Sequence, residues 1–298
     1  MKIAIIGADG QLGTDLVKAG NAFDLLPLTH SDIEVADFDR CQRVLGKLQP
    51  EVIINTAAFH QTDLAEERYE EAFKVNAFGA RNVALACKEI GAFLVHMSTD
   101  YVFHGDQKKP YTEEDSPCPT MAYGISKLAG EQFVRYILGK RRMIVRSSGL
   151  FGLRGSKAKG GKNFIENVLE WSKTRDEVRV VNDQRFSPTY TLDLARKIYH
   201  LLKQGVTGTI HITNTGDCTW FEFAKEILKT IGSLTPRLIP ITTVESGAKS
   251  CRPNYSVLGH RCLQELGLDD LPRWEAALKD YLQARKVKSR EFPAAIST

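Results

Sequence analysis

Features of secreted, metal-binding and membrane proteins are scarce in this sequence. Its six cysteines form no Cys-x-x-Cys pair and have no regular spacing, which argues against a disulfide framework and a zinc site. We therefore predict reduced thiols, no bound metal and a cytoplasmic location. No apolar run approaches the roughly 18 residues of a membrane-spanning helix, and the apolar stretch after Met1 stops at Gly7, too early for a signal peptide. We predict no membrane association.

An excess of charge of one sign is also lacking. Forty basic residues stand against 36 acidic residues, a net charge of +4, and the basic residues are scattered. We therefore predict no nucleic-acid binding. Apolar residues, by contrast, make up 43% of the 298 positions, enough for a large core, and the chain is longer than most single domains. We predict two lobes, residues 1–150 and 151–298.

Short β-branched runs alternate with longer helical patterns, which is typical of βαβ units. The sequence therefore predicts an α/β fold, a Rossmann-type doubly wound parallel sheet with helices on both faces. Beyond residue 150 the pattern loosens, and we predict a smaller C-terminal lobe interleaved with late strands of the sheet, ending in a frayed tail over 286–298. The expected strands are 2–7, 22–28, 51–58, 92–98, 142–148, 177–182 and 208–213, and the main expected helices are 11–20, 37–49, 64–90, 121–139, 163–173, 191–203, 219–231 and 274–284.

The first expected strand runs into "GADGQLG", which has glycines at positions 7, 10 and 13. Glycines between a strand and a helix allow a tight turn and a close approach of a pyrophosphate to the helix N-terminus. This context predicts a dinucleotide site, and the alternative is a turn needed only for packing. The second strand ends in "LTHSD" (28–32), which has no acid before Asp32 and no arginine. His30 and Ser31 suit either nicotinamide cofactor. We favour NADPH, and NADH stays open.

A tyrosine and a lysine stand four places apart in "MAYGISKLAG" (121–130). On a helix, Tyr123 and Lys127 would lie on one face, where a cation favours the phenolate and moves the phenol toward general acid or base chemistry. The alternative is a surface pair on an amphipathic helix. Upstream, "HMSTDYVFHG" (96–105) puts Thr99 and Asp100 at a strand end, where ligands bind in open parallel sheets.

Motifs along nearly the whole chain resemble those of extended short-chain dehydrogenases of the dTDP-4-dehydrorhamnose reductase family. The resemblance implies NAD(P)H-dependent reduction of the C4 ketone of dTDP-4-dehydro-L-rhamnose to dTDP-L-rhamnose, a precursor of cell-surface polysaccharide. It also implies that Tyr123 protonates the ketone oxygen, that Thr99 hydrogen-bonds the same oxygen, and that Lys127 holds the ribose and keeps the tyrosine pKa down. The motifs are "GADGQLG", "NTAAFHQTD" (55–63), "VNAFGARNVA" (75–84), "STDYVFHG", "YGISKLAGE" (123–131), "DQRFSPTYTLDLA" (183–195) and "CRPNYSVL" (251–258).

Further site residues are expected from the same resemblance, although each could instead be a packing residue, and Asn55 and Asn76 could simply tie strand to helix. The expected cofactor-binding residues, besides Tyr123 and Lys127, are Gly7, Gly10, Gln11, Leu12 and Gly13 at the pyrophosphate, His30, Asp37 and Phe38 at the adenosine, Ala57, Ala58 and Phe59 at the inner ribose, and Met97 near the nicotinamide. The expected substrate-binding residues of the C-terminal lobe and strand end are Thr99, Asp100, Asn163, Arg185 and Arg252, where arginine suits diphosphate oxygens.

Several alternatives stay open. The chain could act on another nucleotide sugar as a reductase or epimerase, or be a non-catalytic NADP-binding subunit resembling the regulatory subunit of methionine adenosyltransferase. A homodimer is open too. Leu192 stands where some relatives carry an acid, so we expect no metal-bridged dimer.

Gly149 is where the sequence departs from the family, since many relatives have Trp at this place in an "RTxW" motif and this chain reads "RSSGLFG". An indole can stack on thymine, so we expect a weaker preference for dTDP over UDP here. We also expect Gly149→Trp to tighten dTDP binding if the pocket has room. Phe151, Phe186 and Trp171 are candidate substitutes for the missing ring.

Overall fold

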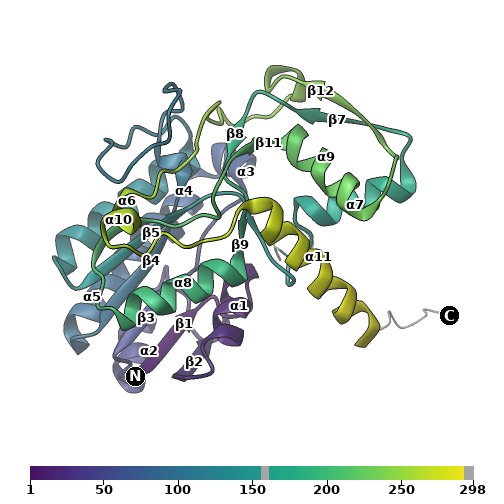
Figure 1. The fold of residues 1–298 in the computed structure, drawn as a ribbon. Helices are drawn as coiled ribbons and strands as arrows, with labels where there is room; N and C mark the ends of the chain where they lie inside the picture. Colours follow the sequence, from purple (N-terminus) through teal and green to yellow (C-terminus); the bar gives the residue numbers. More distant parts are fainter. Residues whose placement is uncertain (156–160, 292–298) are drawn as a thin grey trace.

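The computed structural model describes residues 1–155 and 161–291, and its centre is a six-stranded parallel sheet (Figure 1). The strand order is β10-β5-β4-β3-β1-β2, so the chain crosses from one side of β1 to the other after β2. The loops after β1 and β3 thereby meet at a topological switch point, where ligands of doubly wound sheets bind. The predicted Rossmann-type fold is confirmed. The strands are β1 (Lys2–Ile6), β2 (Asp24–Leu28), β3 (Val52–Asn55), β4 (Phe93–Thr99), β5 (Arg142–Ser147) and β10 (Gly208–His211).

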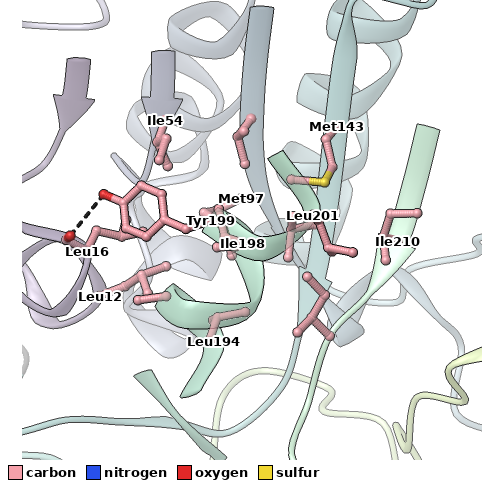
Figure 2. Close-up of a cluster of buried hydrophobic side chains, with 14 of the residues drawn as sticks. Leu12, Leu16, Ile54, Met97, Met143, Leu194, Ile198, Tyr199, Leu201 and Ile210 are labelled. Carbon is pink, nitrogen blue, oxygen red and sulfur yellow. Dashed lines mark hydrogen bonds between the residues drawn. The ribbon is translucent and has the colours of Figure 1, made fainter. Parts of the chain in front are cut away.

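Alternate residues of each strand are buried on opposite faces of this sheet. Ile3 and Ile5 of β1 pack against α1 (Gln11–Ala19) and α8 (Thr191–Lys203). Figure 2 shows this cluster, in which Leu12 and Leu16 face Leu194 and Ile198 and the Tyr199 hydroxyl donates to the Leu16 carbonyl at 2.9 Å. Ala4 and Ile6 pack on the other face against α2 (Phe38–Leu48), α5 (Ala80–Ile90) and α6 (Ala122–Leu138). Burial on both faces explains why these strands read as continuous apolar runs.

The expected single helix over 64–90 is wrong, because this stretch folds as four pieces. Arg68 leaves helical geometry at φ −120°, ψ 48° and separates the first two pieces. The third piece is a π-helix that carries Asn76 on its inner side, and such π-helical turns often occur at functional sites. The pieces are α3 (Thr62–Glu67), α4 (Tyr69–Phe73), η1 (Lys74–Gly79) and α5.

A second cluster of buried side chains lies among α7 (Phe164–Thr174), α9 (Trp220–Ile231) and α11 (Trp274–Glu291). Figure 1 shows α7 and α9 gathered with β7 (Glu177–Val181) and β12 (Arg237–Ile241) away from the N-terminus. The expected strand at 177–182 exists, but it pairs with β12 and lies outside the main sheet, whereas β10 does join that sheet. The domain boundary at residue 150 stays a prediction.

The remaining elements are short. Two small pairs join β6 (Leu150–Phe151) to β9 (Thr189–Tyr190) and β8 (Arg185–Phe186) to β11 (Cys218–Thr219). Single turns form η2 (Asp100–Val102), η4 (Val244–Ser246) and α10 (Arg261–Glu265).

The C-terminal helix is longer than expected. The frayed tail over 286–298 is wrong up to Glu291, where α11 ends, and 292–298 lie outside the described residues. Within 1–155 and 161–291, we find no helix with the length and apolar character needed to cross a membrane.

Candidate active site

The glycine loop after β1 packs tightly onto the start of α1. Gly7 has φ +80°, and the backbone N–H groups of Gly7 and Ala8 both donate to the Leu28 carbonyl at the end of β2, at 2.9 and 3.0 Å. A Cβ on Gly13 would lie 2.0 Å from the Gly7 carbonyl oxygen, so only glycine fits. The α1 N-terminus has no side-chain cap and no acid in its first turn. Its partial positive charge therefore suits the pyrophosphate of a dinucleotide.

The side chains beside this loop divide between core and site. Leu12 is buried in the sheet core (Figure 2), so only its backbone can face a cofactor. Gln11 Nε2 donates to the Leu150 carbonyl at 2.9 Å and ties α1 to β6. Met97 is likewise buried in the core and contributes its backbone carbonyl to the site. The cofactor roles of these residues stay predictions.

At the end of β2, the structure adds an arginine that sequence reasoning missed. Arg40, in the first turn of α2, donates through its guanidinium to the carbonyls of Ser31 and Asp32. Asp37 caps α2 by accepting from the Arg40 N–H at 2.9 Å. The sequence did contain a signal for this contact, namely the predicted start of a helix at residue 37. Residues in the first turn of that helix lie close to the segment that follows β2. In Rossmann-type folds, an arginine near the end of the second strand can accommodate the 2′-phosphate of NADP.

The other predicted residues of the adenosine end are exposed. His30 is largely solvent-exposed, and its Nε2 contacts Glu34 Oε2 at 2.5 Å. Phe38 is 42% exposed, unusual for a large apolar side chain.

Asn76 binds the loop after β3 to α6, the helix that carries Tyr123 and Lys127. This side chain accepts from the Phe59 N–H at 2.8 Å and donates to the Phe59 carbonyl and to Ser126 Oγ, both at 3.0 Å. Ser126 Oγ in turn donates to the Tyr123 carbonyl at 2.8 Å. Asn55 Oδ1 accepts from the Ala57 N–H at 3.1 Å. The backbone at Phe59 is thus held beside α6 by Asn76, whereas Asn55 bonds within the loop that follows its own strand.

Asp100 joins three segments at the end of β4. Its buried carboxylate accepts from Thr99 Oγ1 at 3.0 Å, from Ser148 Oγ at 2.7 Å and from Ser256 Oγ at 2.6 Å. Burial raises the pKa of Asp100 to about 6, although these hydrogen bonds oppose the shift. With its oxygens engaged by three hydroxyl groups, Asp100 organises the strand end, and its predicted substrate contact stays untested.

The Tyr123 phenol lies beside Thr99 and Asp100. Burial, and then the Asp100 carboxylate, raise the pKa of Tyr123 above its usual value, while a hydrogen bond with Thr99 acts in the opposite direction. The expectation that Lys127 keeps this pKa down is wrong for the structure, because the pKa is raised and Lys127 is not among the groups that shift it. A raised pKa keeps the phenol protonated at neutral pH, the form that a proton donor needs.

Lys127 is buried one turn further along α6. Its Nζ donates to the Met97 carbonyl at 2.5 Å. Burial lowers the pKa of Lys127 to about 8, and the Glu131 carboxylate opposes this shift. The ammonium is therefore mostly charged at pH 7 and loses its proton at a much lower pH than an exposed lysine would.

These two shifts predict the alkaline side of the pH–rate profile. If reduction needs both Tyr123 and Lys127 protonated, kcat/KM for NADPH-dependent ketone reduction should fall above about pH 8, since Lys127 titrates first. Steady-state rates between pH 6 and pH 10 in buffers of constant ionic strength would measure this limb. Activity that stays level up to pH 10 would contradict the assignment to Lys127.

The predicted substrate residues lie in two regions. Arg252 donates to Asp63 Oδ2 at 2.8 Å and lies near Tyr101, whose ring meets that of Tyr123 edge-on at 6.3 Å. Arg185 pairs with Asp217 and with Glu222, and its backbone bonds those of Asn254 and Ser256.

Asn163 is not brought to this site. It caps α7 and donates to the Gly152 carbonyl at 3.0 Å and to the Tyr281 hydroxyl at 3.3 Å, within the C-terminal cluster. The expected loop over 152–163 falls partly on residues 156–160, which are outside the described part of the chain.

There is no room for a larger side chain at Gly149, and such room was the condition for Gly149→Trp to tighten dTDP binding. Gly149 has φ +54°, which side chains rarely adopt, and a Cβ there would lie 2.4 Å from the Phe186 ring. Phe186 itself is buried and stacks on Trp220 with ring centroids 4.0 Å apart. Of the three candidate substitutes, Phe186 occupies the space beside Gly149, whereas Phe151 packs on Tyr190 and Tyr281 and Trp171 contacts Arg175. We therefore expect Gly149→Trp to strain the strand end rather than to tighten dTDP binding.

A glycine loop at a sheet switch point, with Thr99 at the end of β4 and Tyr123 and Lys127 beside it on α6, defines an oxidoreductase of the short-chain dehydrogenase class. Residues 1–287 match the family model described as RmlD substrate binding domain. The chain therefore belongs to the dTDP-4-dehydrorhamnose reductase family.

The relatives span nearly the whole chain. The spore coat polysaccharide biosynthesis protein SpsK of Bacillus subtilis is 40% identical, over 95% of this chain and 98% of its own length. A dTDP-4-keto-6-deoxy-D-glucose reductase of Streptomyces niveus is 36% identical, over 92% of this chain and 94% of its own length. The crystal structure of a dTDP-4-dehydrorhamnose reductase from Bacillus anthracis in complex with NADP has a TM-score of 0.89 and 38% identity, covering 95% of this chain and 99% of that one.

Proposed function

We propose that this protein reduces the C4 ketone of dTDP-4-dehydro-L-rhamnose to dTDP-L-rhamnose with NADPH. The observation that carries the proposal is the Thr99–Tyr123 pair, in which a protonated phenol lies beside a hydroxyl at the end of β4. The names of the relatives support the substrate class, and the NADP in the Bacillus anthracis structure supports the cofactor. The tight Gly7–Gly13 packing and Arg40 fit a phosphorylated dinucleotide.

In the proposed reaction, the residues of the chain stabilise the negative charge that develops on the ketone oxygen. Tyr123 donates its proton to this oxygen. Thr99 supplies a second hydrogen bond when its hydroxyl turns from Asp100 toward the substrate, so both donors act most strongly in the transition state. Lys127 holds a positive charge one turn away and is the group proposed to bind the ribose. NADPH, when bound, supplies the hydride that reaches C4.

The direct test is oxidation of NADPH, followed at its absorbance maximum, with enzymatically generated dTDP-4-dehydro-L-rhamnose. Formation of dTDP-L-rhamnose, identified by mass spectrometry and NMR, would support the proposal. Substrate-dependent oxidation that is faster with another 4-keto sugar nucleotide would support the second candidate, a reductase of a related nucleotide sugar. That candidate is favoured by the names of two relatives and by the glycine at position 149. An absence of turnover with every substrate would favour the non-catalytic relative.

Arg40 should determine the preference for NADPH over NADH. Arg40→Ala removes a charged partner of the 2′-phosphate, and hydrogen bonds to charged groups contribute about 1.5–3 kcal/mol, so NADPH affinity should fall roughly 10- to 100-fold. NADH affinity should hardly change. Titration of protein fluorescence with each cofactor, and calorimetry with 2′,5′-ADP, would measure both. Arg43→Ala, on the exposed side of the same helix, is the matched control. Equal losses for both cofactors would contradict a 2′-phosphate role.

We also propose a homodimer that needs no bridging metal, and a cytoplasmic location. Leu192, at the position where some relatives have an acid, is buried in the C-terminal cluster and cannot reach a second chain. All six cysteines are free thiols, which fits a reducing compartment. Light scattering after size-exclusion chromatography, with and without a chelator, would test the dimer and its independence of metal.

A further inference from the structure

One turn beyond Lys127 on α6, one buried carboxylate joins three elements, α6, β4 and β5. Glu131 of α6 is fully buried, and its two oxygens accept from Ser98 Oγ of β4 at 2.6 Å and from Arg146 of β5 at 2.9 and 2.7 Å. Arg135, one turn further along α6, donates to the same carboxylate at 2.9 Å and to Thr209 of β10 at 3.1 Å. Glu131 thus anchors α6 to β4 and β5, and Arg135 extends the contact to β10.

These hydrogen bonds fix the position of α6 along β4. Lys127 and Glu131 lie one turn apart and bind consecutive residues of β4, the Met97 carbonyl and the Ser98 hydroxyl. The next residue of β4 is Thr99, the partner of Tyr123. Ser98 and Arg146 are direct neighbours across the β4–β5 pair, so both side chains reach the Glu131 carboxylate from the sheet. A shift of α6 would therefore break the Lys127, Glu131 and Tyr123 contacts together.

The charges around Lys127 are unbalanced. Arg135 and Arg146 share the Glu131 carboxylate, and Lys127 lies one turn away, so three cations surround one anion. From β4, His96 faces Lys127, and burial followed by the lysine charge lower its pKa well below 6.5. From β10, His211 approaches Arg146, and burial lowers its pKa to about 3. From η2, Asp100 lies beside Tyr123. Both histidines are therefore neutral, and Glu131 is the carboxylate that opposes the loss of the Lys127 proton.

We propose that Glu131 is a positioning residue of the reaction, which aligns Tyr123 and Lys127 along β4 and supplies the negative charge that keeps Lys127 an ammonium. The inference rests on the proposed function for its assay. A purely structural anchor would affect folding and the amount of activity without moving the pH at which activity is lost, because breaking a buried ion cluster changes stability whatever its neighbours do.

The test is the alkaline limb of kcat/KM in three variants. In Glu131→Gln the limb should move down by about 1 to 3 pH units, the usual effect of losing an opposite charge at short range. Glu131→Asp keeps the charge and should keep the limb near that of the native enzyme. Arg135→Gln removes a cation that competes for the carboxylate, so its limb should lie at or above the native position.

Two further measurements separate the possible failures. Thermal unfolding and circular dichroism establish which variants fold. If Glu131→Gln does not fold, Arg135→Gln is the deciding variant. An alkaline limb of Arg135→Gln below the native position would overturn the proposal. A folded Glu131→Gln with the native limb would overturn it as well. The pH dependence of NADPH binding, followed by protein fluorescence, needs no turnover. If the native protein binds NADPH but reduces no sugar, the proposed function fails while the shift of this binding limb in Glu131→Gln still tests the role of Glu131.

Discussion

Replacement of Tyr123 by phenylalanine should lower kcat for ketone reduction by roughly 10²- to 10⁴-fold, the usual contribution of a positioned general acid. The phenol is hydrogen-bonded with Thr99, and its raised pKa keeps it protonated where the enzyme would work. The ring remains in the variant, so its edge-on contact with Tyr101 and the affinity for NADPH should be preserved. Single-turnover rates and fluorescence titration with NADPH measure the two quantities separately.

Tyr136→Phe is the matched control, because it makes the same substitution on the same helix at a side chain that is 89% exposed. Its turnover should equal that of the native enzyme. Near-native turnover in Tyr123→Phe would remove the phenol from the mechanism. An equal loss in both variants would show that the substitution disturbs α6 rather than the chemistry.

Introduction of a single methyl group at Gly13 should weaken both the fold and cofactor binding. In Gly13→Ala the Cβ would lie 2.0 Å from the Gly7 oxygen and 2.7 Å from the Ala8 Cα. These atoms are backbone, so α1 must move away from the loop that positions the pyrophosphate. We expect stability to fall by about 1–3 kcal/mol, as for other overpacked sites, and NADPH affinity to fall at least roughly tenfold because the helix N-terminus is displaced.

Gly46→Ala provides the contrast. Gly46 lies within α2 and a Cβ there would meet no atom within 4 Å. Alanine should therefore raise stability by about 0.5–1 kcal/mol, the gain for glycine in a helix interior, with no change in NADPH affinity. Denaturant unfolding and fluorescence titration would measure both variants. A Gly13→Ala protein that binds NADPH as the native protein does would show that the loop does not hold the pyrophosphate.

Local patterns predicted the elements whose residues are constrained by their immediate neighbours. The strand, glycine turn and helix over residues 2–19 could be read directly, since apolar runs and glycine spacing are local properties. The pairing of Tyr123 with Lys127 on one helix followed from i,i+4 spacing. The stretch 64–90 was misread because its helical composition is continuous, whereas the π-helical turn at Asn76 is accompanied by contacts with distant segments. Asn76 bonds Phe59 and Ser126, and Gly130 packs against the Asn76 carbonyl.

The protonation of the site was likewise outside the reach of sequence. Spacing suggested that Lys127 would lower the Tyr123 pKa, yet burial and Asp100 raise it, and the lysine amine bonds the Met97 carbonyl instead. Burial depends on the whole packed environment, and desolvation is the largest influence on the pKa of both groups.

By itself, the sequence determined the βαβ architecture, the glycine loop and the presence of Thr99, Tyr123 and Lys127, because periodicity and motif spacing are properties of neighbouring residues. Only the tertiary structure decided that Phe186 fills the space beside Gly149 and that Glu131, paired with Arg146 of β5, carries the charge next to Lys127 on α6. Each of these contacts joins residues of different elements. Their proximity is set by the order and register of the strands, which no local pattern contains.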